Sequence, residues 1–181
     1  MAVLPGKGIG AIRFGANRET IQRLMEFPCE VSTTTLCGYN GRAVDFIMTN
    51  GLLEEIRLQR SSRKNLHLPQ ATYGVFNGQF LDGTHLEMLR PTVIELAGAP
   101  QSVEMVTGAN PWNTVERDYY ESAIFEYDRT TSGNIVLGGV ILKNPATAQP
   151  TASAEPIASG RPAPSAGATP SVRPAASARR P

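Results

Sequence analysis

Apolar residues first recur along the chain at the spacing of a short helix. Ile21, Leu24 and Met25 lie three and four positions apart, so they would share one face of a helix. Asn17 suits the N-terminal cap because its side-chain oxygen can accept a hydrogen bond from the first turn, and Pro28 ends the pattern. The spacing therefore predicts a short amphipathic helix that begins after Asn17.

A second short helix is predicted at 91–97, where Pro91 suits the first helical turn and Gly98 the C-terminal cap. Each predicted helix is followed by stretches with the composition or alternation of strands. These stretches are 30–35, 43–48 and 52–58 after the first helix, and 115–128 and 135–142 after the second. Asn50-Gly51 predicts a two-residue turn, because that pair favours positive φ at both positions, and Asn77-Gly78 predicts a further hairpin.

The order of these elements repeats along the chain. The segment from Tyr39 to Leu58 aligns with the segment from Tyr120 to Leu142 with only small gaps, which indicates an internal duplication. We therefore predict an α+β fold of two similar halves, each a short helix followed by an antiparallel β-meander. The halves are assigned to residues 1–70 and 71–144, packed against each other.

Composition changes at Pro145. Residues 145–181 hold 8 of the 14 prolines and 11 alanines, and their only larger aliphatic residues are Ile157 and Val172. Such a segment cannot bury enough apolar surface to offset the entropy of ordering it, so we expect a disordered tail. The tail has 4 arginines against Glu155, whereas the rest of the chain has 13 Lys and Arg against 15 Asp and Glu. This slightly acidic body excludes a strongly basic domain that binds nucleic acid directly.

Several short motifs carry a resemblance to a known module. The chain opens with Gly8-Ile-Gly-Ala-Ile-Arg-Phe-Gly15, returns through Gly51-Leu-Leu-Glu-Glu-Ile56, and has Ala97-Gly-Ala-Pro100 after the second helix. These motifs resemble the small α+β repeat that SmpA/BamE-type outer-membrane lipoproteins share with the beta-lactamase inhibitory protein. The resemblance covers 7–58 and, more faintly, 85–142. It implies a scaffold that binds other proteins on its sheet face, with no catalytic residues to transfer.

The compartment is inferred from the N-terminus and the cysteines. The first residues lack the basic start and apolar run of a secretory signal, and no stretch has the roughly 18 apolar residues of a membrane span. We therefore expect a cytoplasmic protein without a membrane span. In a reducing compartment Cys29 and Cys37 are expected as free thiols. A disulfide between them is also geometrically possible and would fit an exported form of the chain.

The patterns of familiar catalytic and metal sites are nearly absent from the sequence. His67 and His85 lie 18 residues apart, and neither has a ligand spacing to a cysteine, so we expect no metal and no cofactor. The glycines at 6–10 lack the preceding strand and the spacing of a phosphate-binding loop. Only its residue type supports Cys37 as a nucleophile. The sequence therefore favours a protein that is not an enzyme.

Four cations lie close together in the sequence at Arg57, Arg60, Arg63 and Lys64. They could form a patch for phosphate or for an acidic partner. Because no aromatic residue interleaves with them to stack on bases, we expect a solvated strand end and loop instead.

The candidate binding site lies on the predicted long strand 115–128. Strand alternation places Ala123, Phe125 and Tyr127 toward the core and gathers four carboxylates around Tyr120 on the other face. We predict that this acidic, aromatic face steers and holds a basic protein partner. Its residues are Trp112, Glu116, Asp118, Tyr120, Glu126 and Asp128. A plain solvated outer face is the competing interpretation.

Three functions are compatible with these patterns. The favoured one is a cytosolic immunity protein that neutralises a bacterial toxin by occluding its basic surface. The second is an envelope-associated scaffold of the SmpA/BamE type whose leader is missing. The third is a hydrolase that uses Glu126 or Asp128, which requires acids that converge in a pocket.

Overall fold

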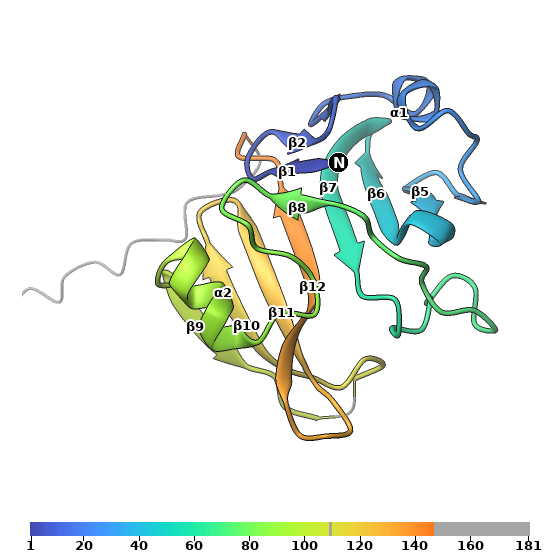
Figure 1. Ribbon diagram of the computed structural model, residues 1–181. Helices are drawn as coiled ribbons and strands as arrows, with labels where there is room; N and C mark the ends of the chain where they lie inside the picture. Colours follow the sequence, from blue (N-terminus) through green and yellow to red (C-terminus); the bar gives the residue numbers. More distant parts are fainter. Residues whose placement is uncertain (109, 147–181) are drawn as a thin grey trace, which may run out of the picture. The chain divides into compact units, whose positions relative to one another are not determined.

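The computed structural model describes residues 1–108 and 110–146. These residues form two sheets and two α-helices in which strands predominate, so the predicted α+β class is confirmed (Figure 1). The expected disordered tail, 145–181, lies almost wholly outside the described residues.

The larger sheet is antiparallel throughout and contains eight strands within the described residues. Its strands, in spatial order, are β4 (Val31–Ser32), β5 (Leu36–Tyr39), β6 (Val44–Thr49), β7 (Leu52–Gln59), β12 (Ile135–Lys143), β11 (Ala123–Arg129), β10 (Thr114–Tyr120) and β9 (Ser102–Met105). β7 and β12 form the central pair, which joins the earlier four strands of this sheet to the later four. β4 and β9 are therefore the two edges.

The smaller sheet is made of very short strands near the N-terminus. Its spatial order is β3 (Ile12–Arg13), β2 (Gly8–Ile9), β1 (Ala2–Leu4) and β8 (Gln79–Phe80). β8 pairs with β1 in parallel. The hairpin predicted around Asn77-Gly78 is therefore wrong, because the residues after the turn pair with the N-terminal strand rather than with the residues before it.

Both predicted helices are confirmed. α1 (Arg18–Met25) begins at Asn17, whose side-chain Oδ1 accepts a hydrogen bond from Thr20 N at 2.9 Å. α2 (Arg90–Ala97) has Pro91 in its first turn. A short 3₁₀ helix, η1 (Asn40–Arg42), links β5 to β6.

The hydrophobic core lies on one face of the larger sheet, beneath both helices and the smaller sheet. Figure 1 shows α2 and strands β1, β2 and β8 in front of that sheet. Buried residues of these covering elements and of the sheet pack together, among them Val3, Ile9, Ile21, Met25, Phe80 and Val93 above, and Phe46, Leu58, Phe125 and Leu142 below. Burying each such side chain contributes about 1.5–3 kcal/mol to the free energy of folding. Within the described residues, neither the helices nor the smaller sheet covers the opposite face of this sheet, and we call it the open face.

The turn predicted at Asn50-Gly51 is confirmed. Both residues have positive φ, 52° and 80°, and they join Thr49 to Leu52, which are cross-strand partners. These are the backbone angles that a two-residue hairpin with matching strand twist requires.

The predicted single strand 115–128 is wrong, because the chain reverses at Glu121-Ser122. Tyr120 lies opposite Ala123 and Asp118 lies opposite Phe125 in the resulting hairpin of β10 and β11. Cross-strand partners share a face of a sheet. Asp118 and Tyr120 therefore lie on the core side of the sheet, and not on the face opposite Phe125.

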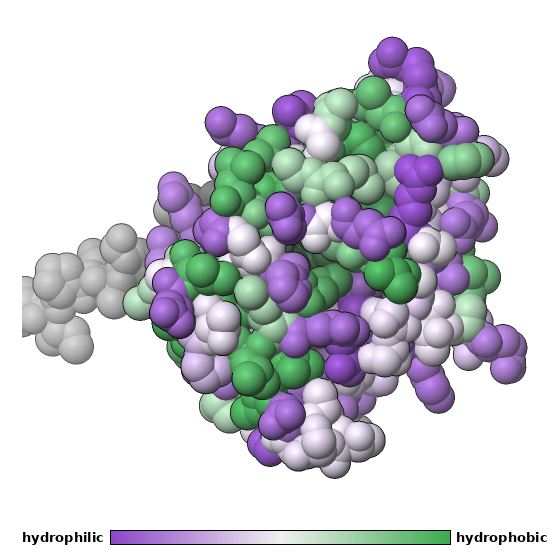
Figure 2. Space-filling view, in the orientation of Figure 1, coloured by the Kyte–Doolittle hydropathy of each residue, from purple (hydrophilic) through white to green (hydrophobic). Residues whose placement is uncertain are grey.

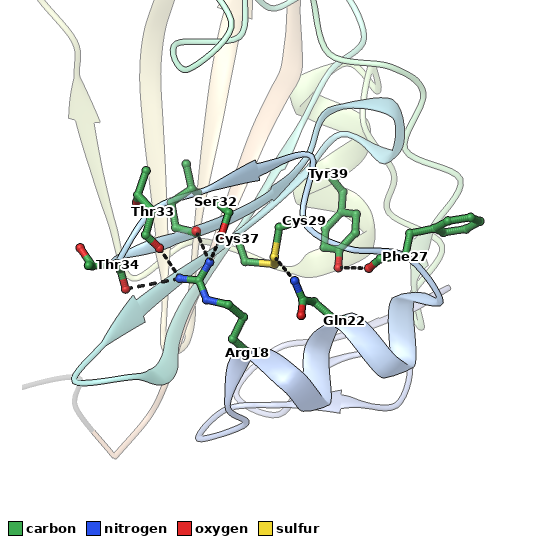
Figure 3. The surroundings of a disulfide bond; sticks show 10 residues. Arg18, Gln22, Phe27, Cys29, Ser32, Thr33, Thr34, Cys37 and Tyr39 are labelled. Carbon is green, nitrogen blue, oxygen red and sulfur yellow. Dashed lines mark hydrogen bonds between the residues drawn. A yellow bond between two sulfur atoms is a disulfide. The ribbon is translucent and has the colours of Figure 1, made fainter.

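The expectation of free thiols is also wrong, because Cys29 and Cys37 form a disulfide with a Cα–Cα distance of 5.1 Å. The bridge ties the segment after α1 to β5 (Figure 3). Gln22 on α1 donates a hydrogen bond to Cys29 Sγ at 3.4 Å. Nearby, the Tyr39 hydroxyl donates to the backbone oxygen of Phe27 at 2.8 Å. The disulfide thus fixes α1 beside the β4 edge of the sheet.

Reduction of this disulfide is expected to lower the free energy of unfolding by about 2 kcal/mol, because a short closed loop removes entropy from the unfolded chain. Chemical denaturation with and without a reductant measures the difference. The double variant Cys29→Ala/Cys37→Ala is the control, since the reductant should not change its unfolding midpoint. An equal response of both proteins to the reductant would contradict the prediction.

Candidate functional site

A fully buried arginine lies at the centre of a charged cluster on the open face. Arg63 follows β7, and its guanidinium donates to both carboxylate oxygens of Asp128, at 2.8 and 2.6 Å. It also donates to Glu126 Oε2 and Gln59 Oε1, each at 2.8 Å, and to Thr114 Oγ1 at 3.1 Å. The cation is therefore fully hydrogen-bonded, which is the condition for burying a charge without a large penalty.

Two consecutive glycines in β12 leave the space that this cluster fills. A Cβ atom on Gly139 would lie 2.2 Å from Arg63 Nη1, and one on Gly138 would lie 2.0 Å from Asp128 Oδ2. Both distances are far below van der Waals contact. Glycine inside a strand is therefore explained here by the close approach of a side chain from another segment.

Trp112 closes the cluster from the loop before β10. Its ring lies 4.7 Å from Arg63 Cζ, within the range of a cation–π interaction. The indole Nε1 donates to the backbone oxygen of Lys64 at 2.8 Å. Trp112 therefore holds the segment after β7 against the sheet.

A second pair of acids lies on the opposite side of the sheet, beneath α2. Arg90 Nη2 donates to Asp118 Oδ1 at 2.8 Å and lies 2.9 Å from Glu116 Oε1. The Arg90 guanidinium also lies 5.6 Å from the ring centroid of Tyr127. Burial raises the pKa of Tyr127, and the charge of Asp118 raises it further. These ion pairs fix α2 on the sheet.

The six predicted binding residues therefore fall into separate environments. Glu126, Asp128 and Trp112 belong to the Arg63 cluster, and Glu116 and Asp118 pair with Arg90. Tyr120 is half-buried against Phe125, and its hydroxyl donates to Gly98 O at 3.1 Å. Burial raises the pKa of Tyr120 to about 12.

The expected solvent-facing row of carboxylates is thus wrong, because all four acids are at most 9 % exposed and are paired with arginines within the chain. Their assignment as partner contacts stays a prediction. A surface groove of about 400 Å³ borders the Arg63 cluster at Gln59 and Arg60, and none of the six predicted residues lines it.

The expected solvated run of four cations is wrong at its centre. Arg63 is buried, and Arg60 Nη2 lies 3.6 Å from Asp128 Oδ2. Arg57 pairs with Glu55 on the same strand. Sequence reasoning missed the role of Arg63, although the unusual Gly138-Gly139 pair inside a strand could have indicated a close side-chain approach.

Asp45 on β6 is a third buried acid on the open face, apart from the Arg63 cluster. It is 3 % exposed and accepts a hydrogen bond from the hydroxyl of Tyr73, whose segment covers it. Gly38 on the neighbouring strand makes room, since a Cβ there would lie 2.8 Å from Asp45 Oδ1. Burial raises the pKa of Asp45, while the Tyr73 hydrogen bond and the charges of His67 and Arg57 oppose the rise.

Beyond these covered acids, a row of four side chains crosses the open face, and three of them are partly exposed. The cross-strand register places Arg57 of β7, Ile141 of β12, Ile124 of β11 and Tyr119 of β10 side by side. Ile124 is the most buried of them, at 9 % exposed. We call these residues the open-face row. Glu55 and Lys143 lie opposite each other beside it, and Glu104 and Arg117 flank its Tyr119 end.

Three further findings concern metal binding, membrane-spanning helices and similarity to known proteins. No group of three or more His, Cys, Asp or Glu side chains among the described residues is arranged to hold a metal ion. The helices of this part of the chain are too short and too polar to cross a membrane. No protein-family model, curated protein or solved structure matches the chain.

Replacing Arg63 by methionine is expected to lower the free energy of unfolding by about 3–5 kcal/mol, because Glu126 and Asp128 lose their shared buried cation. These acids keep only Arg117 and Arg60, at the margin of the cluster. Adding Glu126→Gln and Asp128→Asn should recover part of the loss. Lys64→Met is the matched control, and its exposed side chain predicts a change within about 0.5 kcal/mol. Urea denaturation measures all three variants, and equal losses for Arg63→Met and Lys64→Met would contradict the role assigned to Arg63.

The raised pKa of Asp45 predicts a pH-dependent contribution to stability. Because the folded-state pKa exceeds the unfolded value, near 3.8, this contribution is fully present below that value and is lost as pH rises through the folded pKa. Asp45→Asn should therefore be more stable than the wild type at neutral pH, with a flatter pH profile. Denaturation across pH tests this, with the exposed Glu95→Gln as control. A neutral-pH stability of Asp45→Asn below the wild-type value would refute it.

Proposed function

We propose that the protein works by binding another protein, as an inhibitor or scaffold, through the open face of its larger sheet. The observation that carries the proposal is the open-face row, in which Arg57, Ile141, Ile124 and Tyr119 cross four adjacent strands. Strands hold the backbone of these residues in fixed positions, so little conformational entropy is lost when a partner docks.

The composition of this surface suits a protein interface. Arginine and tyrosine are common among the residues that contribute most to binding, and isoleucine supplies apolar area between them. Charged residues surround the row, including Glu55, Lys143 and Glu104. An apolar centre with a polar rim is the usual arrangement of a non-obligate interface.

The state of the acids supports binding rather than catalysis. A general acid or base must exchange a proton with a substrate during the reaction. Glu126 and Asp128, the residues of the hydrolase hypothesis, instead each hold the Arg63 guanidinium in a buried ion pair. Both carboxylates therefore have a structural task that does not require protonation.

The proposal includes the internal duplication, with halves at 1–70 and 71–144. Each helix precedes four antiparallel strands, β4 to β7 after α1 and β9 to β12 after α2. The two sets follow mirrored spatial orders about the β7–β12 pair. Two copies of one α+β unit joined at equivalent edges would give this order, which supports the resemblance to the SmpA/BamE-type repeat and to the beta-lactamase inhibitory protein.

The disulfide bears on the compartment in which binding occurs. Structural disulfides persist in oxidising surroundings and are rare in the cytosol. The Cys29–Cys37 bridge therefore favours the envelope-associated alternative over a cytoplasmic protein. A cytosolic immunity protein against a toxin with a basic surface is the second candidate, favoured by the excess of acidic residues in 1–144.

The open face can be tested with a photo-crosslinking residue placed at Ile141 in the full chain. The captured protein is purified, and its affinity for the unmodified chain is measured by calorimetry. Arg57→Glu combined with Tyr119→Ala is expected to weaken binding at least about tenfold, because both residues lie in the row. Loss of affinity with an unchanged melting temperature separates a contact effect from unfolding.

Leu81→Asp is the matched control, since Leu81 is 82 % exposed and follows β8 of the smaller sheet. Its affinity should equal that of the wild type. Trp112→Ala tests the site predicted from the sequence in the same assay. Unchanged affinity of the Arg57→Glu/Tyr119→Ala variant beside a weakened Trp112→Ala would reject the open-face row and return the contact to the predicted site.

A further inference from the structure

Strand β9 is an exposed edge of the larger sheet. All four of its residues are exposed, and the apolar Val103 and Met105 are 48 % and 65 % exposed. They lie opposite Asp118 and Glu116, so they are on the same side of the sheet as α2. Figure 2 shows patches of hydrophobic surface among polar ones where α2 lies in Figure 1.

The backbone of β9 offers hydrogen-bonding groups at the same two residues. Val106 N donates to Val115 O of the neighbouring segment at 3.0 Å. In an antiparallel pair, alternate residues direct their N–H and C=O groups to the same partner strand, so Glu104 also faces β10. Val103 and Met105 therefore direct their N–H and C=O groups away from the sheet.

The other edge of the sheet is protected against pairing, which makes the contrast with β9 informative. β4 is only two residues long, and Arg18 of α1 donates to the backbone oxygens of Thr33 and Thr34 just beyond it (Figure 3). Short edge strands and occupied backbone groups are common protections against edge-to-edge association. β9 has twice that length and contains no proline and no lysine.

We propose that β9 pairs with β9 of a second copy of this chain, in antiparallel orientation about a two-fold axis at Glu104. The axis places Val103 opposite Met105 of the other copy, and Met105 opposite its Val103. These are the residues whose backbone groups point outward, so each opposed pair can exchange two hydrogen bonds. The apolar side chains of each pair meet on the α2 side of the sheet. The strand is thus self-complementary, as a two-fold interface requires.

The open face of the joined sheets adds one unfavourable contact. The same axis brings the two Glu104 side chains opposite each other. The hydroxyl of Tyr119 donates to Glu104 and lowers its pKa, so the side chain stays ionised, and Arg117 Nη1 lies 3.6 Å from its Oε2. Like charges opposite each other weaken strand pairing. Glu104 should therefore weaken the pairing of two copies, whereas it would strengthen the pairing with a different protein that has a basic residue at that position.

Sedimentation of the full chain across a wide range of concentration tests the proposal. A concentration-dependent dimer is expected, and Val103→Pro should raise its dissociation constant at least about tenfold, because proline removes an outward N–H without touching the bonds to β10. Met105→Lys should act in the same direction by placing a charge at the edge. Glu104→Gln should instead strengthen the dimer severalfold.

Leu81→Lys is the matched control, because it places the same charge at an exposed leucine away from β9 and should leave the dissociation constant unchanged. A protein that stays monomeric at every concentration overturns the proposal. So does a dimer that ignores both Val103→Pro and Met105→Lys, since its interface then lies elsewhere. A weaker dimer in the Glu104→Gln variant also overturns the proposal, because Glu104 would then face a basic residue and not the Glu104 of a second copy.

Discussion

The burial of Arg63 is the interaction on which the arrangement of the larger sheet depends. Taking a guanidinium out of water costs several kcal/mol unless its hydrogen bonds are replaced. Here the replacements come from β7, β10 and β11, while glycines of β12 leave the necessary space. Arg63 and Asp128 are 65 residues apart, so the cluster forms only when both parts of the sheet have met. A buried polar cluster of this kind specifies one register among the many that apolar strands permit.

The two faces of the sheet consequently have different tasks. One face buries aliphatic and aromatic side chains beneath α1, α2 and the smaller sheet, and supplies most of the stability. The other face has polar clusters at Arg63 and Asp45, and the segment that follows β7 covers both. The open-face row crosses four strands of the same face. Stability and the proposed binding surface are therefore carried by separate sets of side chains.

The sequence predicted the features that are determined locally. The spacing of Ile21, Leu24 and Met25 and the Asn17 cap predicted α1, and Asn50-Gly51 predicted its turn because each depends on neighbouring residues alone. The turn at Glu121-Ser122 contains no glycine, asparagine or proline, so no residue type there indicates it. The prediction therefore continued the strand alternation through the turn and placed Asp118 and Tyr120 on the face opposite the core. The partners of Arg63 depend on tertiary contacts, which spacing in one chain does not encode. The pairing of Cys29 with Cys37 is local, and it was missed because the sequence had indicated a reducing compartment.

The glycines at 138 and 139 couple the evolution of β12 to that of Arg63, which lies far away in the chain. A side chain at either position requires that the guanidinium or its carboxylate partner shift from its place in the cluster. Conversely, a relative that lacks an arginine at position 63 is free to fill this space with ordinary strand-forming side chains. Substitutions at 63, 128, 138 and 139 should therefore co-vary among relatives of this chain, as a signature that separates those with the buried cation from those with a wholly apolar sheet.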